Sequence, residues 1–154
     1  MRLMRKCTLS SLMLGICCVA FPLVAQQPTI TIEAKDTTVL VGQPLRIRII
    51  LKNTTDKEFT VRRSVGGGHG EHYYSITVID PDGKPTARAN QPAIAGSKML
   101  KTVAPGGDVD EYVLLNDMFN MTSPGAYVIQ ATRSSPFDPA ITLKSNLLSI
   151  NVEK

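Results

Sequence analysis

Cysteine is missing from most of this 154-residue chain, because all three cysteines lie in its first 25 residues, at Cys7, Cys17 and Cys18. Residues 26–154 therefore cannot form a disulfide. Thiol chemistry and cysteine-ligated zinc are excluded from them for the same reason. A fold built from residues 26–154 must be held by its hydrophobic core alone, and this length suffices for one such core.

A charge excess of either sign is also missing from residues 26–154. The whole chain has a net charge of +4, but Arg2, Arg5 and Lys6 precede residue 26, whereas every acidic residue follows it. Residues 26–154 thus hold 14 basic and 13 acidic residues, a net charge of +1. This balance argues against nucleic acid or an anionic membrane surface as the partner.

The first 25 residues have the three parts of a secretory signal peptide. A basic start is followed by a largely apolar run from Leu9 to Val24, and Ala25 then precedes a polar stretch. The run is broken at Pro22 and is short for a membrane span. We therefore predict cleavage after Ala25, export to the periplasm or the extracellular space, and no membrane span in the processed chain. An uncleaved anchor and a lipoprotein attached at Cys17 are the alternatives.

Alternation of apolar and polar residues is the dominant pattern of residues 26–154. Residues 45, 47, 49 and 51 are Leu or Ile, whereas residues 46, 48 and 52 are Arg or Lys, as in a half-buried strand. Several such segments separated by turns predict one all-β domain, an immunoglobulin-like antiparallel β-sandwich of about seven to nine strands without a disulfide. The residues expected in its core are Ile30, Ile32, Leu45, Ile47, Ile49, Leu51, Phe59, Val61, Ile76, Val78, Tyr127, Ile129, Leu148 and Ile150.

Residues 84–108 are the least readable part of the chain, with Thr86–Arg88 and Met99–Val103 as candidate short strands. In an immunoglobulin-like sandwich, the strand at 45–51 and the strand at 127–131 should run parallel in opposite sheets. Three strands read between them already give this direction. We therefore expect residues 84–108 to add either no strand or two.

The same parity predicts which loops share an end of the sandwich. Loops 53–57, 81–84 and 134–142 are expected at one end. The glycine-rich loop 65–72 and the turn 117–124 are expected at the other end.

A resemblance follows from the order of the turn and core motifs. Gly42-Gln43-Pro44 precedes the first clear strand, Tyr74–Gly83 ends in Asp-Pro-Asp-Gly, and Pro105-Gly106 precedes Ser123–Tyr127. This order is similar to bacterial immunoglobulin-like modules, namely the bacterial intracellular proteinase inhibitor family and the cell-adhesion-type repeats of secreted proteins. The resemblance spans most of residues 30–152 and implies the fold, but it transfers no inhibitory residue. An intracellular family carries no signal peptide, whereas one is predicted here.

The only two histidines, His69 and His72, lie in the glycine-rich segment Gly66–His72 with Glu71 between them. Imidazole and carboxylate groups are ligands of divalent metals. However, four glycines prevent a helix that would hold both histidines on one face, and no third ligand is evident nearby. We interpret the segment as a flexible loop and predict neither a metal nor a cofactor.

Two groups of carboxylates, Asp80 with Asp82 and Asp108 with Asp110 and Glu111, were candidates for acid–base or calcium chemistry. General acid–base catalysis requires an enclosed site that shifts pKa values. Aspartate is common at turns because its side chain bonds to the local backbone. We interpret both groups as turn residues.

Catalysis by a serine nucleophile is not indicated either, because Ser134 and Ser135 lie in no Gly-x-Ser-x-Gly elbow. We predict no enzyme, but an exported binding or assembly module for an unknown protein or envelope component. A secreted protease inhibitor acting through an extended loop is the alternative, with loop 89–98 as one candidate. For either function the possible partner-binding loop is Ser134, Ser135, Pro136, Phe137, Asp138 and Pro139, where prolines lower the entropy cost of ordering. Tyr127 resembles the structural tyrosine corner of Greek-key sandwiches.

Overall fold

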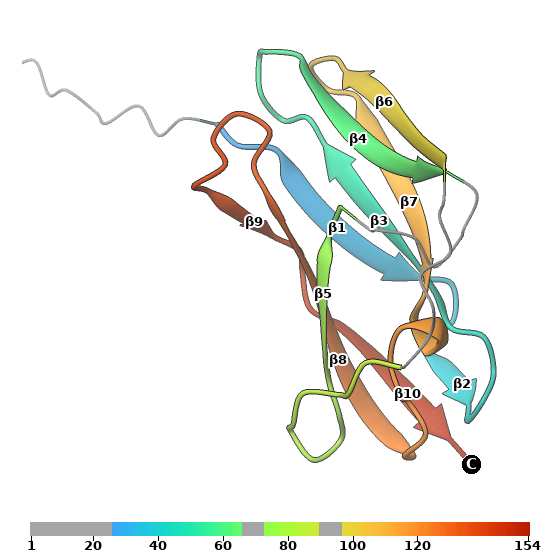
Figure 1. Ribbon diagram of the computed structural model, residues 1–154. Coiled ribbons are helices and arrows are strands. Elements are labelled where there is room, and N and C mark those ends of the chain that lie inside the picture. Colours follow the sequence, from blue (N-terminus) through green and yellow to red (C-terminus); the bar gives the residue numbers. More distant parts are fainter. Residues whose placement is uncertain (1–25, 66–72, 90–96) are drawn as a thin grey trace, which may run out of the picture.

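The computed structural model describes residues 26–65, 73–89 and 97–154, which form ten strands and one short 3₁₀ helix (Figure 1). The predicted signal peptide and the histidines at 69 and 72 lie outside the described residues. Eight of the ten strands have five residues or more. The elements are β1 (Thr29–Ala34), β2 (Thr38–Leu40), β3 (Arg46–Lys52), β4 (Phe59–Val65), β5 (Ser75–Ile79), β6 (Ser97–Val103), β7 (Asp108–Leu114), η1 (Leu115–Asp117), β8 (Gly125–Ser134), β9 (Thr142–Lys144) and β10 (Leu148–Glu153).

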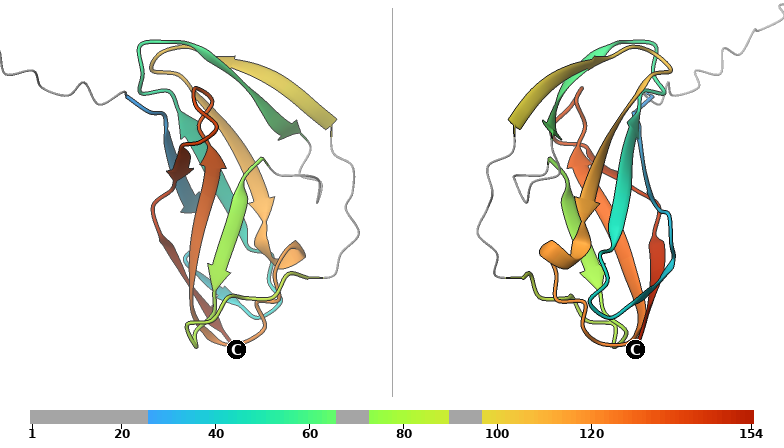
Figure 2. Two further views of the ribbon diagram at one scale, coloured as in Figure 1. Left: turned by 60° about the vertical axis from the view of Figure 1, so that its left-hand side comes forward. Right: turned by 90° about the vertical axis from the view of Figure 1, so that its right-hand side faces the viewer.

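The strands form two facing sheets and one separate ribbon, as two further views show (Figure 2). The first sheet has the order β1-β3-β7, and both of its pairings are antiparallel. The second has the order β2-β10-β8-β5, with β9 also paired to β8. Strands β4 and β6 pair only with each other. The predicted all-β, immunoglobulin-like sandwich is therefore confirmed.

The chain changes sheets early, between β1 and β2. Strand β1 belongs to the first sheet, whereas β2 runs parallel to β10 in the second. The short stretch from Lys35 to Thr37 makes this change, and the amide of Asn151 donates to the carbonyl of Thr37 at 2.7 Å. The two layers are thereby joined at this edge without a disulfide.

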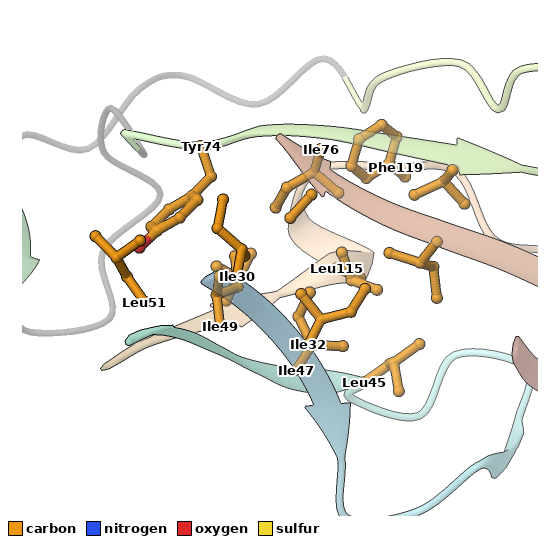
Figure 3. Close-up of a cluster of buried hydrophobic side chains, with 14 of the residues drawn as sticks. Ile30, Ile32, Leu45, Ile47, Ile49, Leu51, Tyr74, Ile76, Leu115 and Phe119 are labelled. Atoms are coloured by element: carbon orange, nitrogen blue, oxygen red, sulfur yellow. The ribbon is translucent and has the colours of Figure 1, made fainter. Parts of the chain in front are cut away.

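The core lies between the two sheets and follows the predicted alternation. Along β3, residues 47, 49 and 51 are fully buried, while Arg46 and Lys52 are exposed. Figure 3 shows Tyr74 and Ile76 facing the isoleucines of β1 and β3 across the sandwich. Every predicted core residue is buried except Leu148, which is partly buried and packs against the same cluster. Buried residues beyond the prediction are Tyr74, Val103, Val109, Val113, Leu115, Phe119, Met121, Ala131, Leu143 and Val152.

Residues 84–108 contribute one strand, β6, so the expectation of none or two was wrong. Near Thr86–Arg88 the structure has only isolated bridges, from Pro85 to Ile79 and from Arg88 to Phe119. The parity count failed because β4 and β5 run in the same direction and do not form a hairpin (Figures 1 and 2). Strands β3 and β8 nevertheless run parallel in opposite sheets, as expected (Figure 2).

The loop prediction was right for two loops and wrong for the third. Loops 53–57 and 134–142 do share one end of the sandwich (Figures 1 and 2). Loop 81–84 lies at the opposite end, where a Cβ on Gly125 would come within 2.7 Å of the Pro81 ring. The error has the same origin as the strand count, because the loop after β5 was placed by assuming that β4 and β5 alternate. Loop 65–72 lies almost entirely outside the described residues.

Tyr127 forms the predicted tyrosine corner at the lower end of β8. Its hydroxyl donates to the carbonyl of Ser123 at 2.9 Å and accepts from the amide of Ser123 at 3.2 Å. The ring itself is 1% exposed, so both polar and apolar parts of the side chain are satisfied. Its role is structural.

Candidate functional site

The predicted partner-binding loop connects β8 to β9 and is held by its own hydrogen bonds. The amide of Ser135 donates to the carbonyl of Ile141 at 2.8 Å, which closes the loop. Inside it, the amide of Ile141 donates to the carbonyl of Asp138 at 3.0 Å, and that of Ala140 to an Asp138 carboxylate oxygen at 2.9 Å. The Phe137 amide donates to Ser135 Oγ at 3.3 Å. The backbone of residues 135–141 thus has a defined conformation of its own.

Two contacts fasten this loop to the body of the protein. The Ser135 hydroxyl, 3% exposed, donates to Gln27 Oε1 at 2.7 Å, and the Gln27 carbonyl accepts from Thr54 Oγ1 at 2.7 Å. The Phe137 ring meets the Phe59 ring edge to face, with centroids 5.4 Å apart and planes at 89°. Loop 135–141, the residues before β1 and the connection from β3 to β4 therefore form one end of the molecule, here called the Phe137 end.

Phe137 is divided between the core and the solvent. One side of its ring packs on buried Phe59, yet the residue is 39% exposed, and Ile141 beside it is 37% exposed. Asp138, Pro139 and Ala140 between them are exposed as well. Ser134 is exposed and Pro136 half-buried. The loop consequently presents two apolar side chains on a braced backbone.

Asn53 fixes the other half of the Phe137 end. Its side chain is fully buried and donates to the carbonyls of Lys57 and Val103 at 2.8 and 3.0 Å. Its Oδ1 accepts from the amide and the hydroxyl of Thr55 at 3.0 and 2.8 Å. One side chain therefore joins the turn after β3 to the end of β6, and no signal in the sequence distinguished this asparagine from an ordinary turn residue.

Of the two carboxylate groups, the one at Asp80 is the predicted turn. Asp80 Oδ1 accepts from the amides of Asp82 and Lys84 at 3.0 and 2.8 Å, and Gly83 has a positive φ of 80°. Such a site uses the carboxylate to order the backbone rather than to bind a ligand. The turn interpretation is confirmed here.

For the second group, the turn interpretation was wrong. Asp108, Asp110 and Glu111 all lie in β7. Asp110 points outward and accepts from Arg48 Nε at 2.8 Å, whereas Glu111 points inward and is 4% exposed. The reason is that Pro105-Gly106-Gly107 completes the turn before residue 108, so alternation within the strand decides which carboxylate is buried.

A polar group surrounds Glu111 between the sheets. The Arg133 guanidinium lies over the Tyr74 ring, 5.2 Å from its centroid. Burial of the Tyr74 hydroxyl raises its pKa, which Arg133 opposes and the nearby Glu111 carboxylate reinforces. The tyrosine hydroxyl therefore stays protonated at neutral pH and does not act as a base.

The outer face of the first sheet holds an ion-pair row beside a groove. Arg48 donates to Glu33 Oε1 at 3.0 Å and to Asp110 Oδ2 at 2.8 Å, and these bonds raise the pKa of its guanidinium. The groove, about 470 Å³ in volume, is lined by residues of both charge signs and by half-exposed Tyr112. Exposed pairs of this kind contribute little to stability.

Within residues 26–65, 73–89 and 97–154, no group of three or more His, Cys, Asp or Glu is arranged to hold a metal ion. No helix in the same residues is long and apolar enough to cross a membrane. The protease-inhibitor candidate at 89–98 falls largely outside the part of the chain that the structure describes.

No protein-family model and no curated protein sequence matches this chain. Among solved structures, it is similar to the CARDB domain of a Pyrococcus furiosus protein in complex with di-metal ions, at 14% identity over 82% of this chain and 94% of that one, with a TM-score of 0.43. It is also similar to a β-glucosidase from Listeria innocua, at 12% identity and a TM-score of 0.43. That likeness covers 82% of this chain and 16% of the glucosidase. The fold assignment rests on the sheets described above.

Proposed function

We propose that this protein is an exported, non-catalytic binding module that docks a partner protein or an envelope component through loop 135–141. The observation that carries the proposal is the pairing of exposure with bracing. Phe137 and Ile141 are 39% and 37% exposed on a loop whose backbone is closed by internal hydrogen bonds. Exposed aromatic and aliphatic side chains are the usual anchors of an interface.

The bracing matters because binding costs entropy wherever a loop must first become ordered. Each rotamer-rich side chain fixed on binding costs about 0.5–1.5 kcal/mol, and a loop already in its bound form avoids the backbone part of this cost. Ser135, whose hydroxyl is committed to Gln27, supports a structural rather than a nucleophilic role for the serine pair. The geometry thus favours recognition over chemistry.

A protease inhibitor would have to present a loop that enters an active-site cleft. Loop 135–141 is closed into a turn by the Ser135–Ile141 and Ile141–Asp138 bonds, which favours a docking surface over an inserted strand. Inhibition therefore becomes an outcome of the test below rather than a second proposal.

The test is quantitative affinity capture from the envelope fraction of the source cells, with the exported protein as bait. Ile141→Ser and Phe137→Ala should each lose the captured partner. Leu147→Ser, which removes a side chain that is 65% exposed elsewhere, should retain it. The proposal fails if all four baits capture the same proteins in the same amounts. A protease among the lost proteins, inhibited by the wild-type protein in a steady-state assay, would favour the inhibitor.

Stability must be measured alongside, because Phe137 also packs on Phe59. An edge-to-face pair contributes about 0.5–1.5 kcal/mol beyond burial, so Phe137→Ala should lower the melting temperature. Ile141→Ser lacks this contact and should leave the melting temperature nearly unchanged. Loss of capture by Ile141→Ser alone already separates docking from folding.

A further inference from the structure

The ribbon of β4 and β6 leaves one strand edge without a partner in the described residues. Strand β4 turns residues 59 and 61 into the core, while its neighbour β6 lies on the outside of the ribbon (Figure 2). Residues 99–102 of β6 are all exposed, on both faces of the strand. Among them Met99 is 48% and Leu100 65% exposed. An exposed edge of this length, with apolar residues, is a template for pairing with another strand.

The charge of this ribbon differs in sign from the rest of the protein. Strands β4 and β6 contain Arg62, Arg63, Lys98 and Lys101 and no acidic residue. Residues 26–154 outside these two strands hold ten basic and thirteen acidic residues, a net charge of −3. The near-neutral total therefore conceals a segregated basic ribbon.

The cross-strand register places these charges beside the exposed apolar residues. Arg62 lies opposite Leu100 and Arg63 opposite Met99, while Lys101 lies opposite buried Val61. A strand added along β6 would thus meet apolar side chains and cations in alternation. Acidic side chains on that strand would be attracted, and basic ones repelled.

A second copy of this chain fits the same edge poorly. Pairing β6 with itself would bring the four cations of one ribbon against the four of the other. Lysines on edge strands oppose such self-pairing in natural sheets. The same lysines do not oppose an acidic strand, so they select between partners.

We propose that the free edge of β6 binds an extended acidic segment of a partner protein by strand addition. Backbone hydrogen bonds along the edge supply the common part of the affinity, and Arg62 and Lys101 select for glutamate or aspartate. This surface is distinct from loop 135–141, and the two sites can be tested separately.

The test uses the purified protein, expressed from the full chain, and acetylated, amidated peptides that alternate valine with glutamate. The matched control peptide carries lysine in place of glutamate, and another has alternate N-methylated backbones that cannot complete the ladder. At about 50 mM salt the glutamate peptide should bind at least about tenfold more tightly than the lysine peptide. Amides of β6 should exchange with solvent at least about tenfold more slowly in its presence.

Protein variants then locate the binding. The double variant Arg62→Glu, Lys101→Glu should weaken glutamate-peptide binding by about fivefold or more, while Lys144→Glu on β9, the same change at another exposed strand, should not. Leu100→Ala should weaken binding of both charged peptides without lowering the melting temperature, because Leu100 is 65% exposed.

Three results would overturn the inference. These are equal binding of both charged peptides, no binding of either, or concentration-dependent self-association that protects the β6 amides. Unchanged peptide binding by Ile141→Ser would show that this site and the proposed docking loop are independent.

Discussion

Replacing Asn53 should separate the sandwich from its β4–β6 ribbon more cleanly than any other single change. In Asn53→Ala the buried Val103 carbonyl and the Thr55 amide lose their side-chain partner, while the carbonyl of Lys57 keeps a bond from Thr55 Oγ1 at 3.0 Å. Each orphaned buried group costs about 1–3 kcal/mol, so we expect a loss of about 2–6 kcal/mol in the free energy of unfolding.

Asn53→Asp sharpens the prediction, because it keeps the acceptors and removes the donors. The new carboxylate would face the carbonyls of Lys57 and Val103, which now accept at 2.8 and 3.0 Å. Burial and these carbonyls would raise its pKa in the folded state, so the protonated form is favoured there. The destabilisation should therefore be small below the unfolded value of about 4 and grow as the pH rises through the folded pKa.

Urea unfolding followed by far-ultraviolet circular dichroism suits this test, because the chain contains no tryptophan. Asn120→Asp, the same change at an exposed position, serves as the control and should leave stability within about 0.5 kcal/mol of the wild type at each pH. Wild-type stability of Asn53→Asp at neutral pH, or a deficit that does not change with pH, would refute the assigned bonding.

Three further predictions follow from single features. Ile47→Ala, at a fully buried position, should cost about 2–5 kcal/mol, whereas Arg46→Ala should cost less than about 0.5 kcal/mol; equal losses in urea unfolding would mean a register slipped by one residue. Tyr127→Phe should cost about 1–3 kcal/mol by the same assay, since it removes both bonds of the tyrosine corner, and no loss would deny the corner a structural role. The intact mass of the exported protein should begin at Gln26, and a product that retains Cys17 would favour an anchor.

Alternation in the sequence was enough to assign inward and outward faces but not to pair the strands. Ile47 and Ile49 are buried because each strand that packs on a core must turn every second side chain toward it. The same rule predicted Val61 correctly without indicating that β4 leaves the main sheets to pair with β6. Pairing depends on contacts between segments far apart in the chain, and a short polar-edged strand such as β6 carries little local signal for them.

The candidate loop was predicted in part for a similar reason. Prolines and exposed-type residues around Phe137 marked it as a stiff surface loop, and the structure places Phe137 against Phe59. The bracing by Gln27 and the side-chain network of Asn53 were not predictable, because amide side chains in turns carry no periodic pattern. Glu111 was missed because a buried carboxylate breaks the pattern on which the reading relied.

The account is tested most directly by mapping the contact surface on the protein itself. The partner recovered by affinity capture is added to the ¹⁵N-labelled protein, and amide exchange is compared with and without it. We predict that protection concentrates in residues 135–141 and around Phe59, with the rest of the sandwich unchanged. Protection confined to the outer face of β1, β3 and β7, with loop 135–141 unaffected, would contradict the proposed docking site.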